Sequence, residues 1–411
     1  MAQLQILRFP RAGFDVVAAL QRRLNKHKTI IAAFGIAIWV VSVLSYSILR
    51  PQYNWDVVGY VARAHIILGV DSADLHAATY RTIRAATTDE QFRRIVGPQS
   101  ATPPGFGETA FADPHAFSEL HPWYAIRPAY NYLLAATAFL GANTAKATVW
   151  ISAIAASAGL AICMLIALRF AGLYAALVLL PIAGILVGLL DVATLSTPDA
   201  VSFFAMSVVA YAWIQGYFWV MLMGATTLPL IRTDLVLVSA AITLAATSAY
   251  RGRLIFLCAM GCFQFFEVAA INVTTDYPGW AAIFQVSLVK SNLFPLTAPE
   301  PLTVSNAARA YLRGIVGLVR DQAFLFVVFL WATIAVIVLR SFNRWSQEQL
   351  VMLKPALTLS ALSLVTFLAH FALFPASWPR FFLGVYMWSI LAILIVFTES
   401  FEAHPKLRIE K

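Results

Sequence analysis

A single carboxylate in the segment NWDVVGY (residues 54–60) is the sharpest chemical signal in the sequence. Asp56 follows the first long apolar run by only a few residues and opens a stretch with the period of an amphipathic helix. A carboxylate held just outside a membrane can act as a general base. An aspartate at a helix start also serves as an N-terminal cap, because it accepts hydrogen bonds from the first backbone N–H groups. The two interpretations do not exclude one another.

Three arginines stand where they could contact an anion at the depth of the lipid headgroups. Arg232 and Arg380 fall at the outer ends of apolar runs, and Arg127 lies on a second amphipathic stretch. A guanidinium at that depth can stabilise the charge on a departing phosphate. The alternative is that each side chain only extends its charged end to the interface. Arg380, Arg232 and Arg127 are therefore candidate phosphate-binding residues.

Further acidic residues stand near the same face. Asp199 follows Pro198 at the start of an apolar run, where capping of a helix is the competing interpretation. Asp234 lies two residues after Arg232 and can pair with it. Glu267 lies inside an apolar run, so its carboxylate must be paired, protonated or in contact with water. Asp199 and Glu267 are candidate residues of a substrate cavity.

The composition places these residues in a membrane protein. Of the 411 residues, 60% are hydrophobic and 12% are charged, whereas a soluble domain carries about 25% charged residues. Several apolar runs exceed the roughly 18 residues that cross the hydrocarbon core as a helix. Backbone groups in lipid need partners within their own segment, which predicts an all-α polytopic bundle. We expect about ten transmembrane helices, at 29–49, 145–168, 172–190, 200–215, 217–231, 233–250, 254–272, 322–340, 355–374 and 381–398.

The basic residues predict the orientation of the chain and no nucleic-acid partner. The net charge of +9 arises from Lys and Arg at span ends, and no basic groove with interleaved aromatic residues is visible. Their distribution among short loops predicts an inner (cytoplasmic) membrane protein with both termini in the cytoplasm and the active site facing the periplasm. Residues 1–28 form a cytoplasmic segment, and residues 29–411 form one transmembrane domain. The three cysteines lie inside apolar runs and are expected to pack there.

Two long outer segments, 50–144 and 273–321, belong to this domain. The first reads as two amphipathic stretches, Trp55 to about Val70 and Tyr124 to Leu140, joined by an irregular Pro/Gly-rich connection. Helices of this kind lie along the membrane interface. The second segment predicts another interfacial helix after a proline-containing loop. Both segments should pack on the bundle and cover a cavity.

The order of these features resembles the GT-C superfamily of integral membrane glycosyltransferases that use polyprenyl-phosphate sugars. WDVVGYVARA (55–64) looks like the family's acidic residue in the first outer loop, followed by Tyr60 at helical spacing. LHPWYAIRPAYNYLLAATAFLG (120–141) resembles its His-Pro-aromatic juxtamembrane helix, and STPDAVSFFAM (196–206) its Pro-Asp segment. LPLIRTDLVL (228–237) is similar to its mid-chain basic segment, and PASWPRFFLGVYMW (375–388) to its closing Arg-aromatic segment. One departure is the single acid, because many members carry paired carboxylates at this point.

The resemblance implies an inverting glycosyltransferase that moves a sugar from a polyprenyl-phosphate donor to a glycan, lipid or protein acceptor on the outer side. Asp56 would be the general base, and Arg380, Arg232 and Arg127 would bind the donor phosphate. Tyr60 and His121 would join Asp199 and Glu267 in the substrate cavity. No metal-ligand spacing is visible among the histidines, although a divalent metal remains possible as a cofactor. The alternatives are an oligosaccharide polymerase or ligase and a lipid or glycan transporter.

Overall fold

The structure, a computed structural model, describes residues 27–97, 106–289, 294 and 296–402. The predicted N-terminal segment 1–28 lies almost entirely outside these ranges, as do the basic residues after Lys406. Within the described ranges the regular structure is helical, and the only β pairing is an isolated bridge between Gln52 and Leu195. The predicted all-α class is therefore confirmed.

In the part of the chain that the structure describes, six helices are long and apolar enough to cross a membrane. They are α2 (Lys28–Leu49), α10 (Thr144–Phe170), α17 (Leu254–Thr274), α20 (Gln322–Ser341), α21 (Gln347–Leu373) and α22 (Leu383–Glu402). The other four predicted spans coincide with shorter apolar helices: residues Gly172–Leu186, α14 (Asp199–Gln215), α15 (Phe218–Ile231) and α16 (Val236–Ala249). The structure thus describes a membrane-embedded helix bundle, and the count of ten crossings stays a prediction.

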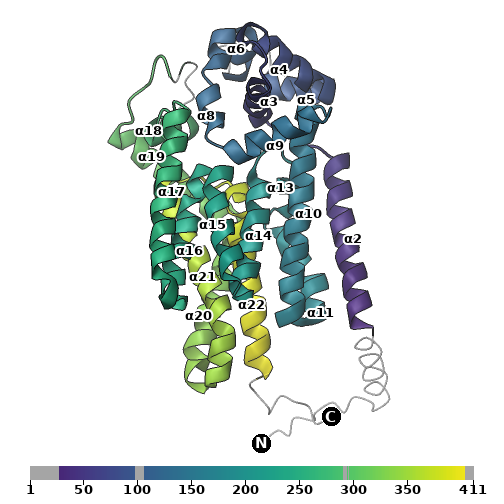
Figure 1. Cartoon of the computed structure of the whole chain (residues 1–411), viewed down its shortest axis with the longest axis vertical. Helices are drawn as coiled ribbons and strands as arrows, with labels where there is room; N and C mark the ends of the chain where they lie inside the picture. Colours follow the sequence, from purple (N-terminus) through teal and green to yellow (C-terminus); the bar gives the residue numbers. More distant parts are fainter. Residues whose placement is uncertain (1–26, 98–105, 290–293, 295, 403–411) are drawn as a thin grey trace, which may run out of the picture.

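The first outer segment forms a helical cap on one end of the bundle, which we call the crown (Figure 1). The crown comprises α3 (Asp56–Ile67), α4 (Ser72–Ala86), α5 (Asp89–Val96), α6 (Phe106–Ala112), α7 (Pro114–Ser118), α8 (His121–Ala125) and α9 (Pro128–Phe139). Its own apolar core includes Val57, Val61, Ile83, Phe117 and Leu134. The expected helices at both ends of this segment are present as α3 and α8–α9.

The prediction of an irregular connection between those two helices was wrong. Helices α4 and α5 occupy its first part, and α6 and α7 follow the undescribed residues 98–105. The physical reason lies in local helix starts. Asp71 caps α4, Thr88 and Gln91 form a reciprocal capping box at α5, and Asp113 caps α7, in which proline takes the first position.

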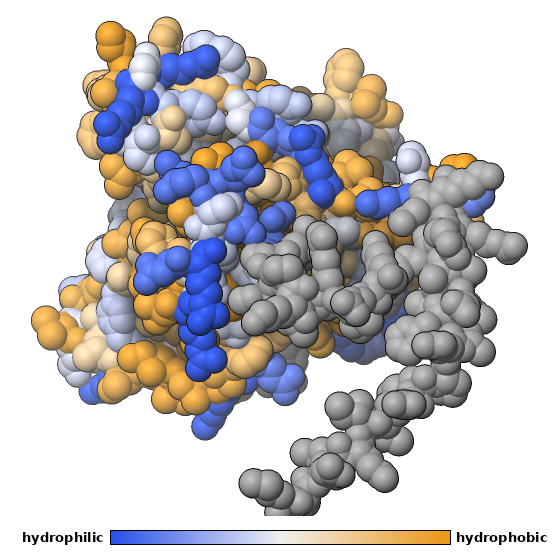
Figure 2. Space-filling model, turned by 90° about the horizontal axis from the view of Figure 1, so that it is seen from below, coloured by the Kyte–Doolittle hydropathy of each residue, from blue (hydrophilic) through white to orange (hydrophobic). Residues whose placement is uncertain are grey.

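The end of the bundle opposite the crown carries exposed basic residues. Helix α2 begins there, α10 ends there, and α20 and α21 meet there (Figure 1). The exposed basic residues at these helix ends are Lys28, Arg169, Arg251, Arg340, Arg344 and Lys354. Figure 2, which views this end, shows hydrophilic side chains among apolar ones. These six described residues, all predicted to be cytoplasmic, therefore share one end of the molecule.

The second outer segment packs beside the crown. It contains α18 (Trp280–Phe284), a π-helical turn at Gln285–Val289, and α19 (Val304–Arg320), which is the predicted interfacial helix. Gly314 and Gly317 of α19 lie against the backbone and side chains of Pro375 and Ser377, because only a glycine leaves room for that approach. Helix α19 thus supports the loop that leads to Arg380.

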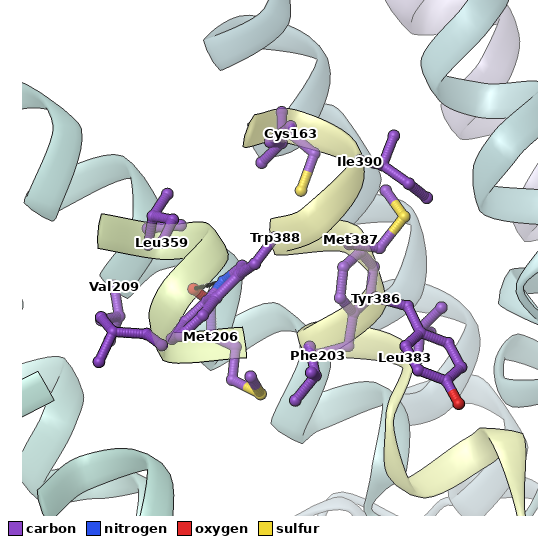
Figure 3. Close-up of a cluster of buried hydrophobic side chains, with 14 of the residues drawn as sticks. Cys163, Phe203, Met206, Val209, Leu359, Leu383, Tyr386, Met387, Trp388 and Ile390 are labelled. Carbon is purple, nitrogen blue, oxygen red and sulfur yellow. Dashed lines mark hydrogen bonds between the residues drawn. The ribbon is translucent and has the colours of Figure 1, made fainter. Parts of the chain in front are cut away.

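The membrane bundle is held by large apolar side chains of α10, α14, α21 and α22 (Figure 3). Trp388 is fully buried and donates a hydrogen bond from Nε1 to the Met206 carbonyl, 3.1 Å away. Phe203 fills the space over Gly159, where a Cβ would come within 2.7 Å of its ring. This close packing fixes the start of α14, where Asp199 stands, against the start of α22, which follows Arg380.

Candidate functional site

Asp56 stands in the first turn of α3, on the crown side of the bundle, and does not cap the helix. Its carboxylate accepts hydrogen bonds from the Tyr124 hydroxyl at 2.8 Å and from Arg380 Nη1 at 2.9 Å. The amide of Asn54 donates a third hydrogen bond at 2.6 Å. About a quarter of the side chain is exposed, 23%. The capping alternative therefore fails, and the carboxylate is oriented by side chains from three parts of the chain.

Tyrosines and Arg127 form the crown side of the site. The ring of Tyr60, one helical turn after Asp56, meets the ring of Tyr124 edge-on at 4.9 Å. The Arg127 guanidinium lies 5.6 Å from the centres of both rings and donates to the Trp123 carbonyl. No carboxylate lies within 4.0 Å of it among the described residues. Arg127 is thus a partly buried cation whose nearest partners are aromatic rings and a carbonyl.

A second charge cluster lies behind Asp56, at the starts of α14 and of η2 (Thr233–Leu235). Arg232 bonds to Asp234 through both Nε, at 3.1 Å, and Nη2, at 2.7 Å. Its Nη1 donates to Asp199. His370 Nε2 lies 3.2 Å from Asp234. The predicted pairing of Arg232 with Asp234 is confirmed, and the Asp199 carboxylate is bound to arginine.

Arg380 connects the two clusters. Its Nη1 donates to Asp56, and its Nε lies 3.9 Å from the second oxygen of Asp199. The ring of Phe381 lies under both guanidinium groups, 4.4 Å from that of Arg232 and 5.1 Å from that of Arg380. The site is therefore a continuous line of alternating charge from Asp234 through Arg232, Asp199 and Arg380 to Asp56.

The electrostatics keep Asp56 ionised. Burial disfavours its charged form, but the Arg380 guanidinium and the hydrogen bond from Tyr124 outweigh that cost, so the pKa of Asp56 lies below its usual value. Burial, reinforced by the charge of Asp56, raises the pKa of Tyr124 well above its usual value. Tyr124 therefore stays protonated and donates to Asp56.

Two cavities meet at this site. The larger, about 500 Å³, is bordered by Asp56, Arg127 and Arg380 together with Trp55, Trp123 and Trp378. The smaller, about 240 Å³, is bordered by Arg232, Asp234 and His370 and by apolar residues of α16 and α17. Arg127, Ile283, Phe374 and Phe381 border both cavities. A polar chamber beside the crown thus adjoins a more apolar one that lies against bundle helices.

The structure brings together most of the predicted site residues. Asp56, Tyr60, Arg127, Asp199, Arg232 and Arg380 form one connected cluster. Asp199 and Arg232 are almost fully buried, with side chains 3% and 5% exposed. Neither Asp199 nor Tyr60 borders the larger cavity, because Arg380 and Tyr124 cover them from that side.

Glu267 and His121 lie apart from this cluster. Glu267 is partly buried on α17, and both of its oxygens lack a hydrogen-bond partner in the described part of the chain. His121 borders a separate crown cavity of about 490 Å³ with His76 and Phe117. Burial and the nearby Arg63 lower the pKa of His121 to about 4, so its imidazole is neutral near pH 7.

The sequence shows no metal-ligand spacing but does not exclude a divalent metal as a cofactor. Within residues 27–97, 106–289, 294 and 296–402, no three His, Cys, Asp or Glu side chains form a group that could hold an ion. Asp56, Asp199 and Asp234 are each bound to an arginine.

Sequence reasoning assigned no role to Asn54, Tyr124 or Trp378. A local signal existed for Asn54, which stands two residues before Asp56. Tyr124 lies in the HPWY segment but reaches Asp56 across 68 residues of sequence, so only the packing of α8 on α3 reveals the contact. Comparison of the chain with protein-family models, with characterised proteins and with solved structures found no match.

Proposed function

We propose that the protein is a glycosyltransferase that moves a sugar from a polyprenyl-phosphate donor to an acceptor on the crown side of the membrane. The observation that carries the proposal is an oriented, ionised carboxylate, Asp56, at the wall of a cavity that also contains cations and aromatic rings. The fold class and the resemblance to the GT-C superfamily support the same reaction. The acceptor is a hydroxyl of a glycan, lipid or protein in the periplasm of an inner-membrane system.

In this mechanism the acceptor oxygen attacks the anomeric carbon of the donor sugar while its proton passes to Asp56. The bond from the anomeric carbon to the phosphate oxygen breaks, and that oxygen keeps the electron pair. A direct displacement inverts the configuration at the anomeric carbon. A positioned carboxylate contributes about 10²–10⁴-fold to such a step. Tyr124 and Arg380 lower the pKa of Asp56 and so weaken it as a base, and its suitability for the role therefore rests on the fixed position of its ionised carboxylate at the cavity wall.

Arg380 and Arg127 are the proposed phosphate contacts. Both border the larger cavity, and Arg127 borders the smaller one as well. Arg232, the third predicted contact, already directs three nitrogens to Asp199 and Asp234. A phosphate that approached Arg232 would first have to displace the partly exposed Asp234 or the buried Asp199, and removing the cation from the buried carboxylate is costly. We therefore assign the charge stabilisation of the departing phosphate to Arg380 and Arg127.

The pair of cavities suits an amphiphilic donor. Val236, Leu237 and Val268 give the smaller cavity an apolar wall on α16 and α17, at the depth of the bundle. Three tryptophans and three arginines, Arg94, Arg127 and Arg380, give the larger cavity rings and donors that suit a sugar. A donor with its phosphate at Arg127 would have its lipid chain on the bundle side and its sugar near Asp56.

Purified protein incubated with a panel of radiolabelled polyprenyl-phosphate sugars tests the proposal. We expect hydrolysis or transfer of at least one sugar, with loss of the labelled donor from the lipid phase. The matched control is Asp56→Asn, incubated with the same panel. Equal donor loss in the presence and absence of the wild-type protein, for every sugar of a panel that covers hexoses and pentoses, would contradict the proposal.

A further inference from the structure

Arg380 is shared between two carboxylates of different character. Asp56 takes its Nη1 hydrogen bond at 2.9 Å, whereas Asp199 lies 3.9 Å from its Nε. Asp56 borders the cavity, but Asp199 is sealed behind the guanidinium with 3% of its side chain exposed. The position of Arg380 against Asp56 therefore depends on a carboxylate that no substrate in the larger cavity would touch.

Asp199 in turn is fixed by partners on both oxygens. Arg232 Nη1 donates to Oδ1, and the Thr197 hydroxyl donates to Oδ2 at 2.7 Å. Asp234 holds Arg232 from the other side with a two-pronged contact. Without such a cation, the desolvation of the buried carboxylate would destabilise the fold unless another cation moved close enough to pair with it. The nearest other cation is Arg380.

We infer that Asp199 and Arg232 are positioning residues, which set how the Arg380 guanidinium is divided between Asp199 and Asp56. Arg232 neutralises Asp199, so that Arg380 keeps its stronger contact with Asp56. Asp199 retains the Nε end of Arg380, so that the group does not turn fully onto Asp56. The consequence for sugar transfer rests on the proposed function, but the geometry and its electrostatic test do not.

The inference predicts opposite effects for the two residues. Without the Arg232 charge, Asp199 should draw Arg380 away, and Asp56 should take up a proton at higher pH. Without the Asp199 charge, Arg380 should pair with Asp56 alone. Asp56 should then take up a proton at lower pH. The other titratable or charged groups that face Asp56 are Tyr124 of α8, Tyr60 of α3 and Arg127 at the start of α9, and neither substitution changes them or the Asn54 amide that also donates to Asp56.

The test is an infrared pH titration of the protonated carboxyl group of Asp56 in the full-length protein in detergent. Each protein is measured against the same protein carrying Asp56→Asn, so that the difference isolates Asp56. Arg232→Gln should move the midpoint up by about one pH unit, and Asp199→Asn should move it down by about as much. The double variant Asp199→Asn/Arg232→Gln also lacks the Asp199 charge that would draw Arg380 away, so its midpoint should lie below that of the wild type, as in Asp199→Asn.

The control is Arg84→Gln, which removes an exposed crown arginine paired with Asp89 and should leave the midpoint unchanged. Arg232→Gln leaves the buried Asp199 and the partly exposed Asp234 with one cation fewer, so it is the variant most exposed to misfolding. If it does not fold, a downward shift in Asp199→Asn that the double variant retains still supports the inference. Equal midpoints in Asp199→Asn, the double variant and the wild type would overturn it. If the midpoints move as expected and no variant or wild-type protein transfers sugar, the proposed function fails and the positioning role stands.

Discussion

At the scale of single residues, most charged side chains of the site are paired with one another, and only a few border the cavity where a ligand could bind. Asp199, Asp234 and Arg232 compensate one another in the interior. Asp56 and Arg380 are paired but remain about one-quarter exposed at the cavity. Arg127 has no carboxylate within ion-pair distance among the described residues. An incoming phosphate would therefore meet Arg127, which has no carboxylate partner among the described residues, and Arg380, which is shared with the proposed base Asp56.

Arg380→Lys is expected to lower turnover at least about tenfold, or roughly 1.4 kcal/mol of transition-state stabilisation. A guanidinium can bond Asp56 and present further N–H groups to a phosphate while it stacks on Phe381, whereas an ammonium cannot keep that planar geometry. Turnover and KM for the donor are measured with Arg84→Lys as the control, because Arg84 lies on the exposed surface of α4. Near-normal turnover of Arg380→Lys would mean that the residue only extends its charge to the interface.

His121 gives a prediction about stability and pH. Its pKa is about 4 in the folded protein and about 6.5 in an unfolded chain. Between these values the unfolded chain binds the proton and the native crown does not, so stability falls as pH decreases from about 6.5 to about 4. His121→Gln should remove part of this slope in thermal unfolding, and His115→Gln, at an exposed position, should not. A slope identical in wild type and His121→Gln would show that His121 does not titrate in this way.

Site residues could be predicted from the sequence where the residues that act together are also close together in the chain. Asp56 and Tyr60 are one helical turn apart on α3, and Arg232 and Asp234 are two residues apart. The contact of Arg380 with Asp56 spans 324 residues, and nothing in the local sequence favours it over any other pairing. The sequence also could not distinguish an arginine free to bind phosphate from one committed to carboxylates, because Arg232 and Arg380 both stand at the end of an apolar run.

At the scale of elements, the crown positions the base by close packing of α8 on α3. A Cβ at Gly59 would overlap the ring of Tyr124, so this glycine admits the tyrosine that bonds Asp56. We expect Gly59→Ala to displace Tyr124 and to lower both thermal stability and transfer. Gly261→Ala on α17 is the matched control, because a Cβ there meets no atom within 4 Å and alanine favours a helix over glycine. Equal stability and transfer in the two variants would contradict the packing argument.

The bundle elements could be predicted, and the middle of the crown could not. Each predicted span contains an apolar helix because hydrophobic length is itself the physical requirement for crossing a membrane. Helices α5, α6 and α7 have only eight, seven and five residues, and single caps at Asp71 and Asp113 set the starts of α4 and α7. Proline and glycine in the same segment favoured an irregular loop. Burial of Leu75, Ile83 and Phe117 in the crown core supplies the stability that such short helices lack alone.

At the scale of the whole molecule, the two ends of the bundle differ in kind. One end carries the crown and the site, and the other carries exposed basic residues (Figures 1 and 2). Single cysteines introduced at positions 300 and 346 of a cysteine-free variant test the proposed orientation. A membrane-impermeant thiol reagent should label position 300 in intact cells and position 346 only after permeabilisation. The reverse pattern would place the site in the cytoplasm.

The central claim is that Asp56 is the base for sugar transfer at this membrane face, and Asp56→Asn tests it most directly. Asparagine keeps the size of the side chain and can still accept a hydrogen bond from Tyr124, but it cannot take the acceptor's proton. Because Asp56 caps no helix, we expect the Tm to change by only a few degrees. The initial rate of transfer from the polyprenyl-phosphate sugar identified in the panel should fall at least about 10²-fold. A folded Asp56→Asn protein that transfers sugar at the wild-type rate would contradict the account.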